Sequence, residues 1–297
     1  VGAPESRKIL LFEQKDNGWG YLATLTAGDT EPAAIGSTIA ITENYVVAGD
    51  SNGISPVLQT DYTGVAYVFE KPAGGWQSMT ATAVLYPSTV LESPRFGASV
   101  AASGDTIVIG DPAGRVYVFE KPEEGWRTGI ETAILRSSDF QPNDRFGHAV
   151  SIAGDTVAVS AINKQTGAVY LYEKAGLKWT SMTETAKLVP NSPGHPTDYG
   201  KFGLSIHLDG DTLVAGSPRD LVGGIESGTV YIFIKPTAGW FSGMAPIARL
   251  FPSNGQPLDL FGGSVFHSEG KIIVCSPNSH RERTGPTQVY FFEKPAG

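Results

Sequence analysis

The stretch FGASVAASGDTIVIGDPAGRVYVFEKPEEGW, residues 96–126, returns along the chain with small changes. FGHAVSIAGDTVAVSA opens a second copy at residue 146, and FGLSIHLDGDTLVAGSP opens a third at residue 202. The Phe-Gly pairs that begin the clearest copies stand at residues 96, 146, 202 and 261, so they are spaced by 50, 56 and 59 residues. Self-similarity on this scale predicts an array of structurally similar units.

Each copy predicts four short β-strands. In the copy that starts at Phe96, runs rich in Val, Ile, Tyr and Thr lie at 97–102, 106–110, 115–120 and 132–135, and Gly, Asp and Pro separate them. The turns are short, so neighbouring strands must run antiparallel. Four-stranded units repeated at this interval predict an all-β protein, a β-propeller of four-stranded antiparallel blades.

We expect one propeller domain over residues 1–297, with units at about 1–25, 35–85, 96–135, 146–188, 202–250 and 261–297. The third strand recurs six times but the first strand only five times. A closed ring would therefore need residues beyond one or both ends. We expect six or seven blades and favour seven for a complete ring, since open sheet edges expose unpaired backbone groups.

Composition narrows the class of protein. Hydrophobic residues make up 41% of the 297 residues and charged residues 18%, which is typical of a globular protein. The formal net charge of −8 argues against a nucleic-acid partner, because phosphate binding favours a basic surface. No apolar run reaches the roughly 18 residues of a membrane span. We expect no signal peptide within these 297 residues, which open inside a repeat at VGAP.

The Phe-Gly pairs, together with VGAP at residues 1–4 and AGSP at residues 215–218, resemble FG-GAP repeats. Such repeats form the blades of the integrin α-subunit propeller and of related fungal lectin and bacterial surface propellers. The resemblance covers nearly the whole chain. It implies a secreted or cell-surface protein with a lectin-like or adhesion role, and it says more about fold than about function.

Blades of the integrin type often carry a calcium loop, Asp-x-Asp/Asn-x-Asp/Asn-Gly, between strands one and two. The corresponding turns here are tight hairpins such as Ser103-Gly104-Asp105 and Asp209-Gly210-Asp211. They offer too few oxygens for the six to eight ligands of calcium. We therefore expect no cofactor and no metal in these hairpins, and leave open weak calcium binding around Asp50, Asn52 and Asp61.

Two sets of residues recur with the repeat, and both are interpreted as structural. The five tryptophans (Trp19, Trp76, Trp126, Trp179 and Trp240) and the alternating Tyr and Phe of strand three are expected to fill the gaps between blades. Glu70, Glu120, Glu173 and Glu293, each followed by a lysine, are interpreted as solvated turn charges.

No motif supports catalysis. The five histidines show no close metal-ligand spacing, and neither a Gly-x-Ser-x-Gly sequence nor a phosphate-binding loop is present. We expect the protein not to be an enzyme. A propeller enzyme with an active site in the channel, and a structural block of a larger surface protein, remain as alternatives.

The loops between strands two and three, and between one unit and the next, vary in length and sequence. Variable loops on a rigid scaffold are where recognition usually resides. We therefore predict an extracellular module that binds a glycan or a protein through polar and aromatic loop residues. The candidates are Asp61, Tyr62, His195, Asp198, Tyr199, Asn278, His280 and Arg281.

Overall fold

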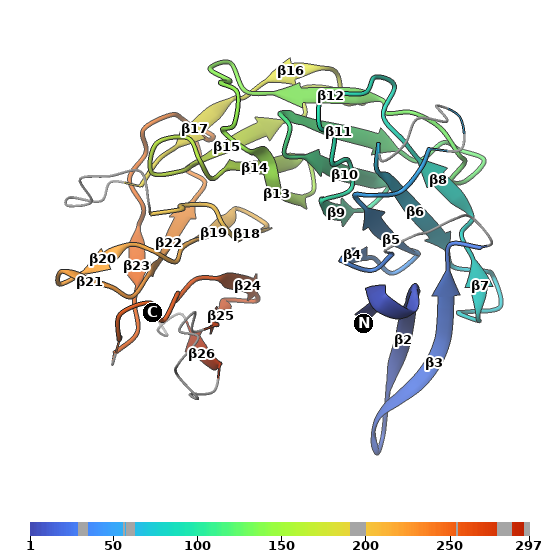
Figure 1. Ribbon diagram of the computed structural model, residues 1–297, viewed down its shortest axis with the longest axis horizontal. Coiled ribbons are helices and arrows are strands. Elements are labelled where there is room, and N and C mark those ends of the chain that lie inside the picture. Colours follow the sequence, from blue (N-terminus) through green and yellow to red (C-terminus); the bar gives the residue numbers. More distant parts are fainter. Residues whose placement is uncertain are drawn as a thin grey trace. The chain divides into compact units, whose positions relative to one another are not determined.

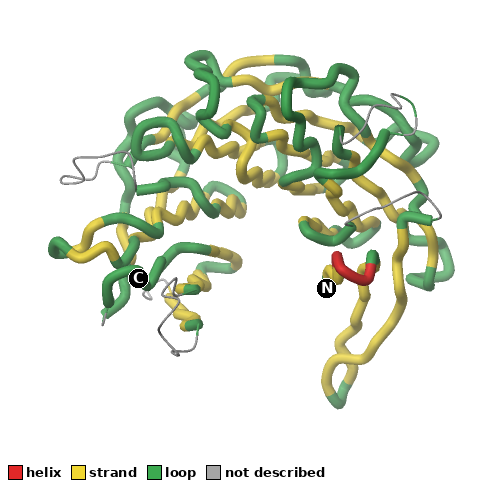
Figure 2. Tube along the Cα trace, viewed as in Figure 1, coloured by secondary structure: helices red, strands yellow, loops and turns green. Residues whose placement is uncertain are grey.

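The computed structural model describes residues 1–28, 35–55, 57, 63–190, 200–253, 255–277 and 287–293. These residues form β-strands joined by turns, with one short 3-10 helix, η1 (Pro4–Ser6), so the predicted all-β class is confirmed (Figures 1 and 2). They group into two compact units. Unit 1 contains Val1–Leu135 and Ala175–Met182, and unit 2 contains Arg136–Lys174 and Thr183–Gly297.

Unit 1 holds three sheets, which we name blades one to three. Their strands are β1 (Gly2–Ala3), β2 (Lys8–Lys15) and β3 (Gly18–Thr26) in blade one; β4 (Thr38–Ile41), β5 (Tyr45–Asp50), β6 (Val65–Glu70) and β8 (Ala83–Leu85) in blade two; and β9 (Ser99–Ser103), β10 (Thr106–Asp111), β11 (Arg115–Glu120) and β12 (Ala133–Arg136) in blade three.

Unit 2 holds blades four to six. Their strands are β13 (Phe146–Ala153), β14 (Thr156–Ala161), β15 (Ala168–Glu173) and β17 (Ala186–Leu188) in blade four; β18 (Ile206–Asp209), β19 (Thr212–Ser217), β22 (Thr229–Ile234) and β23 (Ala248–Leu250) in blade five; and β24 (Ser264–Ser268), β25 (Lys271–Ser276) and β26 (Gln288–Glu293) in blade six. A small hairpin of β20 (Leu221–Val222) and β21 (Ile225–Glu226) interrupts blade five.

The blades have the predicted antiparallel order. In blade three, β10 pairs with β11 from Thr106↔Glu120 to Asp111↔Arg115, and β11 then pairs with β12. The described residues thus form six propeller blades, the lower of the two expected numbers. One pairing was not predicted: β7 (Met79–Thr80), from the repeat of blade two, runs parallel to β3 of blade one. A similar short strand, β16 (Met182–Thr183), lies beside β12.

The glycines of the repeat allow neighbouring blades to meet backbone to backbone. A Cβ atom on Gly49 of β5 would lie 2.0 Å from the carbonyl oxygen of Gly97, the Phe-Gly glycine of the next blade. Gly216 of β19 and Gly262 repeat the same arrangement at 2.0 Å. The Ser205 hydroxyl donates a hydrogen bond to that Gly262 carbonyl at 2.9 Å. At these two junctions glycine is needed because no side chain fits between the two backbones. Blade four carries the buried Ser160 at the position of Gly216, so the same close approach is not made at every junction.

The phenylalanine of each Phe-Gly pair anchors an aromatic cluster. Phe96 is fully buried and meets the rings of Tyr117 and Phe119 edge-on at centroid distances of 5.1 and 6.1 Å. Phe146, Phe202 and Phe261 make the same pair of contacts with strand three of their own blades. Tyr117 and Phe119 belong to the same buried hydrophobic cluster as Val47 and Val68 of blade two, which confirms that the alternating aromatic residues form a core between blades.

The tryptophans follow the prediction with one exception. Trp126, Trp179 and Trp240 are buried, and Trp126 meets Tyr45 of blade two edge-on at 5.2 Å. Trp19, however, is 72% exposed, so its predicted packing role is wrong. The reason is local: Trp19 is a strand residue of the β2–β3 hairpin, paired with Gln14, rather than part of a Lys-Pro-x-x-Gly-Trp turn.

Three of the four glutamates at the end of strand three, Glu70, Glu120 and Glu173, tie blades together, so their interpretation as solvated turn charges is wrong, whereas Glu293 is exposed. Glu70 Oε2 accepts the backbone N–H of Trp126 at 3.2 Å, and Glu70 Oε1 lies 2.5 Å from Lys121 Nζ. Glu120 likewise accepts the N–H of Trp179 at 3.2 Å. In unit 2, Glu173 pairs with Lys235 at 2.7 Å. Each bond joins the third strand of one blade to the turn that follows the third strand of the next.

A second tie between blades involves the residue two positions after tryptophan. Its hydroxyl accepts the N–H of a fourth-strand residue in the preceding blade at 3.0 to 3.1 Å. The four pairs are Thr24 with Ser78, Val84 with Thr128, Ile134 with Ser181, and Lys187 with Ser242. Four blade contacts are therefore marked in the sequence by Trp-x-Ser/Thr, a signal that was not among the predictions.

The glycine contact yields a stability prediction. Gly216→Ala should lower the free energy of unfolding by about 3 kcal/mol, because its Cβ would have to displace the Gly262 backbone. Gly176→Ala is the matched control, since a Cβ there meets no atom within 4 Å, and it should be neutral or stabilise by up to about 1 kcal/mol. Urea unfolding of both variants measures the difference, and equal midpoints would show that the close contact does not matter.

Candidate functional site

The antiparallel topology gives every blade two distinct ends. Loops one-to-two and three-to-four lie at one end, while loop two-to-three and the connection to the next blade lie at the other, which we call the variable-loop end. In blade four this end is formed by residues 137–145, which lead into β13, and by residues 162–167, which join β14 to β15.

The predicted ligand-binding residues lie outside the described residues. These are Asp61, Tyr62, His195, Asp198, Tyr199, Asn278, His280 and Arg281. Of the three residues named for weak calcium binding, Asp50 and Asn52 are described and Asp61 is not. Asp50 is buried, and its Oδ1 accepts the N–H of Asn52 at 3.1 Å. Asp50 thus shapes the start of the long loop of blade two.

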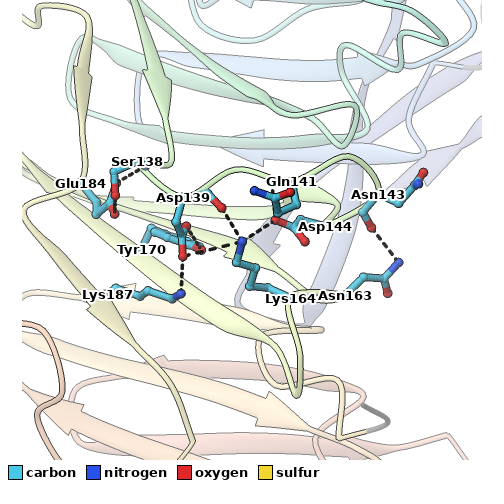
Figure 3. A network of polar contacts seen from close by, with 10 residues as sticks. All are labelled: Ser138, Asp139, Gln141, Asn143, Asp144, Asn163, Lys164, Tyr170, Glu184 and Lys187. Carbon is cyan, nitrogen blue, oxygen red and sulfur yellow. Dashed lines mark hydrogen bonds and ion pairs between the residues drawn. The ribbon is translucent and has the colours of Figure 1, made fainter.

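A polar network occupies the variable-loop end of blade four, and Lys164 lies at its centre (Figure 3). Lys164 Nζ donates to Asp144 Oδ2 at 2.9 Å and to the backbone carbonyl of Asp139. The lysine and Asp144 side chains are only 13% and 10% exposed. Gln141 N–H donates to the same Asp144 oxygen at 2.8 Å. Lys164 therefore joins loop two-to-three of the blade to the connection that enters it.

Asp139 receives donors from two strands of the blade. Its Oδ1 accepts the Tyr170 hydroxyl at 2.8 Å, and its Oδ2 accepts Lys187 Nζ at 2.6 Å. Burial alone would raise the pKa of Asp139. The bonds from Lys187 and Tyr170 and the charges of Lys187 and Lys164 outweigh it and hold the pKa below its usual value. Burial and the bond to Asp139 both raise the pKa of Tyr170.

Neighbouring blades show variations of the same arrangement. In blade five the Tyr231 hydroxyl donates to Asp220 Oδ2, and the Ser217 hydroxyl donates to Asp220 Oδ1 at 2.8 Å. In blade three the Asp111 carboxylate accepts the N–H groups of Arg95 and Ala113, both at 3.0 Å. Burial raises the pKa of Asp111 despite these bonds. A strand-three tyrosine bonded to an aspartate thus occurs in blades four and five, whereas the Tyr117 hydroxyl of blade three is buried without a hydrogen-bond partner among the described residues.

The function of these pairs is to hold the bases of the loops. In unit 2 each aspartate accepts donors from more than one segment, so the loop backbones are fixed close to the sheet. From the sequence, Tyr170 and Tyr231 are expected to belong to the aromatic core alone. The missed signal is chemical: strand three carries tyrosine rather than phenylalanine at this position, and a buried hydroxyl needs a partner.

The described part of the chain shows no metal-binding cluster of three or more His, Cys, Asp or Glu side chains. Nor do the described residues include a helix with the length and apolar character needed to cross a bilayer. The network in blade four holds lysines and carboxylates that are already paired with one another. It is therefore suited to positioning loops rather than to accepting a proton from a substrate.

The network allows a test of its role. Lys164→Met should lower the free energy of unfolding by about 3 kcal/mol, because the mostly buried Asp144 carboxylate loses its cationic partner. Arg127→Met is the control, since its pair with Glu124 is largely exposed and should contribute less than about 1 kcal/mol. Urea titration near neutral pH compares the two, and a smaller loss for Lys164→Met than for the control would contradict the assignment.

Comparison with known proteins agrees with the blade structure. A family model for the FG-GAP repeat matches residues 130–172 and 182–233. The first match begins just before β12 and runs through most of β15, and the second covers β16 to most of β22. The comparison with curated proteins gave no significant match.

Proposed function

Since this chain is a β-propeller assembled from FG-GAP repeats, we propose that it is an extracellular or cell-surface recognition module. Its ligand is a glycan or an extracellular protein, bound by the loops at the variable-loop end of the blades. The proposal is for binding rather than catalysis, and it includes no nucleic-acid partner.

The observation that carries this proposal is the contrast between the two ends of the blades. At one end, residues 121–126 and their counterparts repeat closely and take part in the ties between blades. At the other end, loop two-to-three has four residues in blade three (Asp111 to Gly114 in the sequence) but extends over residues 50–63 in blade two. A constant framework with variable loops is the usual arrangement of a recognition scaffold.

The chemistry of the variable loops fits sugar hydroxyls and polar protein surfaces. Tyr62, Tyr199 and His280 supply flat rings for stacking. Asp61, Asp198, Asn278 and Arg281 supply directional hydrogen-bond donors and acceptors. Blade packing does not account for these residues, because they fall outside the repeated positions.

A glycan-array screen, with and without calcium, followed by a screen against extracellular proteins, would identify the ligand. Once it is known, the triple variant Tyr62→Ala, Tyr199→Ala and His280→Ala should weaken binding at least tenfold. Its unfolding free energy should change by only about 0.5 kcal/mol per site, as is usual for loop substitutions.

The control for this test lies at the opposite end of the blades. Glu123 and Leu177 are exposed turn residues, and Leu177 is 96% exposed, so Glu123→Gln and Leu177→Ala should leave binding unchanged. Glu70, Glu120 and Glu173 are unsuitable because they tie blades together. If the control variants lose binding and the triple variant binds normally, the ligand binds at the end opposite the variable-loop end, and the proposal is wrong.

We also propose that the hairpins between strands one and two hold no calcium. Asp105, Asp155 and Asp211 each sit in a two-residue turn between paired strands, with too few nearby oxygens for a hard cation. Calorimetric titration should therefore give the same calcium response for the natural protein and for the variant with all three aspartates changed to Asn. Tight binding that the three changes abolish would contradict this.

A further inference from the structure

The first strands of blades four, five and six are linked by one repeated hydrogen bond. Leu208 N–H of β18 donates to the Ser151 hydroxyl of β13 at 2.9 Å. His267 N–H of β24 donates to His207 Nδ1 of β18 at 3.3 Å. Ser151 and His207 both stand five residues after the phenylalanine of their Phe-Gly pair, and Leu208 and His267 both stand six residues after it. The two bonds are therefore equivalent contacts at successive blade junctions.

The acceptors of these two bonds differ in one chemical respect. A serine hydroxyl accepts a hydrogen bond at any physiological pH. An imidazole nitrogen accepts only while it carries a lone pair, so His207 must be neutral, with its proton on Nε2. Protonation of Nδ1 would place two N–H groups against each other and remove the bond.

We propose that the junction between blades five and six is a pH-sensitive contact, in which protonation of His207 at Nδ1 releases β24 from β18. The adjacent junction between blades four and five, with Ser151 as acceptor, lacks this sensitivity. The inference does not depend on the proposed ligand-binding function, because both partners are framework residues.

The surroundings of His207 favour its neutral form. Burial lowers the pKa of His207, the Asp209 carboxylate on its own strand acts against this shift, and His267 of β24 adds to it. The ring of Phe266, also on β24, lies tilted against the imidazole with a centroid distance of 4.5 Å. On the other side β13 presents the neutral Ser151 to the β18 backbone. Protonation of His207 therefore places a positive charge in a partly apolar site, next to the imidazole of His267, and this disfavours the charged form.

His267 makes the junction more sensitive to added charge. Its side chain is 11% exposed, and its Nδ1 has no hydrogen-bond partner among the described residues. The carboxylate of Asp209 comes no closer to this nitrogen than 3.9 Å, at Oδ2, which is too far for a hydrogen bond. The junction thus has one carboxylate for two imidazoles, and that carboxylate is nearly half exposed.

The sign of the pH effect follows from the direction of the pKa shift. A histidine whose pKa is lowered by folding binds fewer protons in the folded state than in the unfolded state. Its contact is intact above the ordinary value of about 6.5 and is progressively lost as the pH falls below it. The junction should therefore loosen on acidification and close again at neutral pH.

Hydrogen exchange at single amides tests the proposal directly. Between pH 7.5 and pH 5.0, the protection factor of the His267 amide should fall by about tenfold or more, because protonation of the acceptor removes its hydrogen bond. The protection factor of the Leu208 amide, which is bound to Ser151, should change much less. Equal changes at both amides would indicate general acid loosening and overturn the proposal.

His207→Ser is the matched variant, because it copies the acceptor of the neighbouring junction. In this variant the protection factor of the His267 amide should no longer depend on pH in this range. Retention of the pH dependence seen in the natural protein would overturn the proposal. If the variant fails to fold, nitrogen chemical shifts of the natural protein decide instead: at pH 7.5 they should show the His207 proton on Nε2, and a proton on Nδ1 would refute the contact.

Discussion

The structure depends on the close approach of two glycine backbones at each glycine-paired blade junction. Gly216 of β19 faces the carbonyl of Gly262 in the next blade with no room for a Cβ atom, and Gly49 and Gly97 repeat the contact in unit 1. This contact fixes the distance and register of adjacent sheets within each unit. The longer-range ties, such as Glu70 with Trp126, can form only because the sheets are already set at that spacing.

Much of the fold could be predicted because the same packing problem recurs in every blade. The spacing of the Phe-Gly pairs predicts the positions of the blades along the chain. The alternation of Tyr117 and Phe119 predicts which face of strand three packs against the neighbouring blade. Periodicity identifies a position in the repeat, but it does not show what covers that position. Trp19 has the repeat position of a sealing residue and is exposed, while Glu70 looks like a surface charge and joins two blades.

The loop network could not be predicted for a different reason. Lys164 reaches the carbonyl of Asp139 and the carboxylate of Asp144, which lie 25 and 20 residues earlier in the chain. Within the described residues no other blade shows this network, so comparison among the copies gives no signal. The recurring part is the tyrosine hydroxyl of strand three, which finds Asp139 in blade four and Asp220 in blade five. The aspartate comes from a different loop in each case, and only the folded chain shows that the two are equivalent.

Repetition also allows the chain to vary one junction without altering the others. Each blade contact combines the glycine approach, the aromatic core and several hydrogen bonds, so one acceptor can change while the remaining contacts hold the sheets in place. Ser151 and His207 fill the same repeat position and accept the same backbone N–H, yet only the imidazole can be protonated near neutral pH. A repeat fold can thus acquire a local response at a single junction, because its stability is distributed over many similar interfaces.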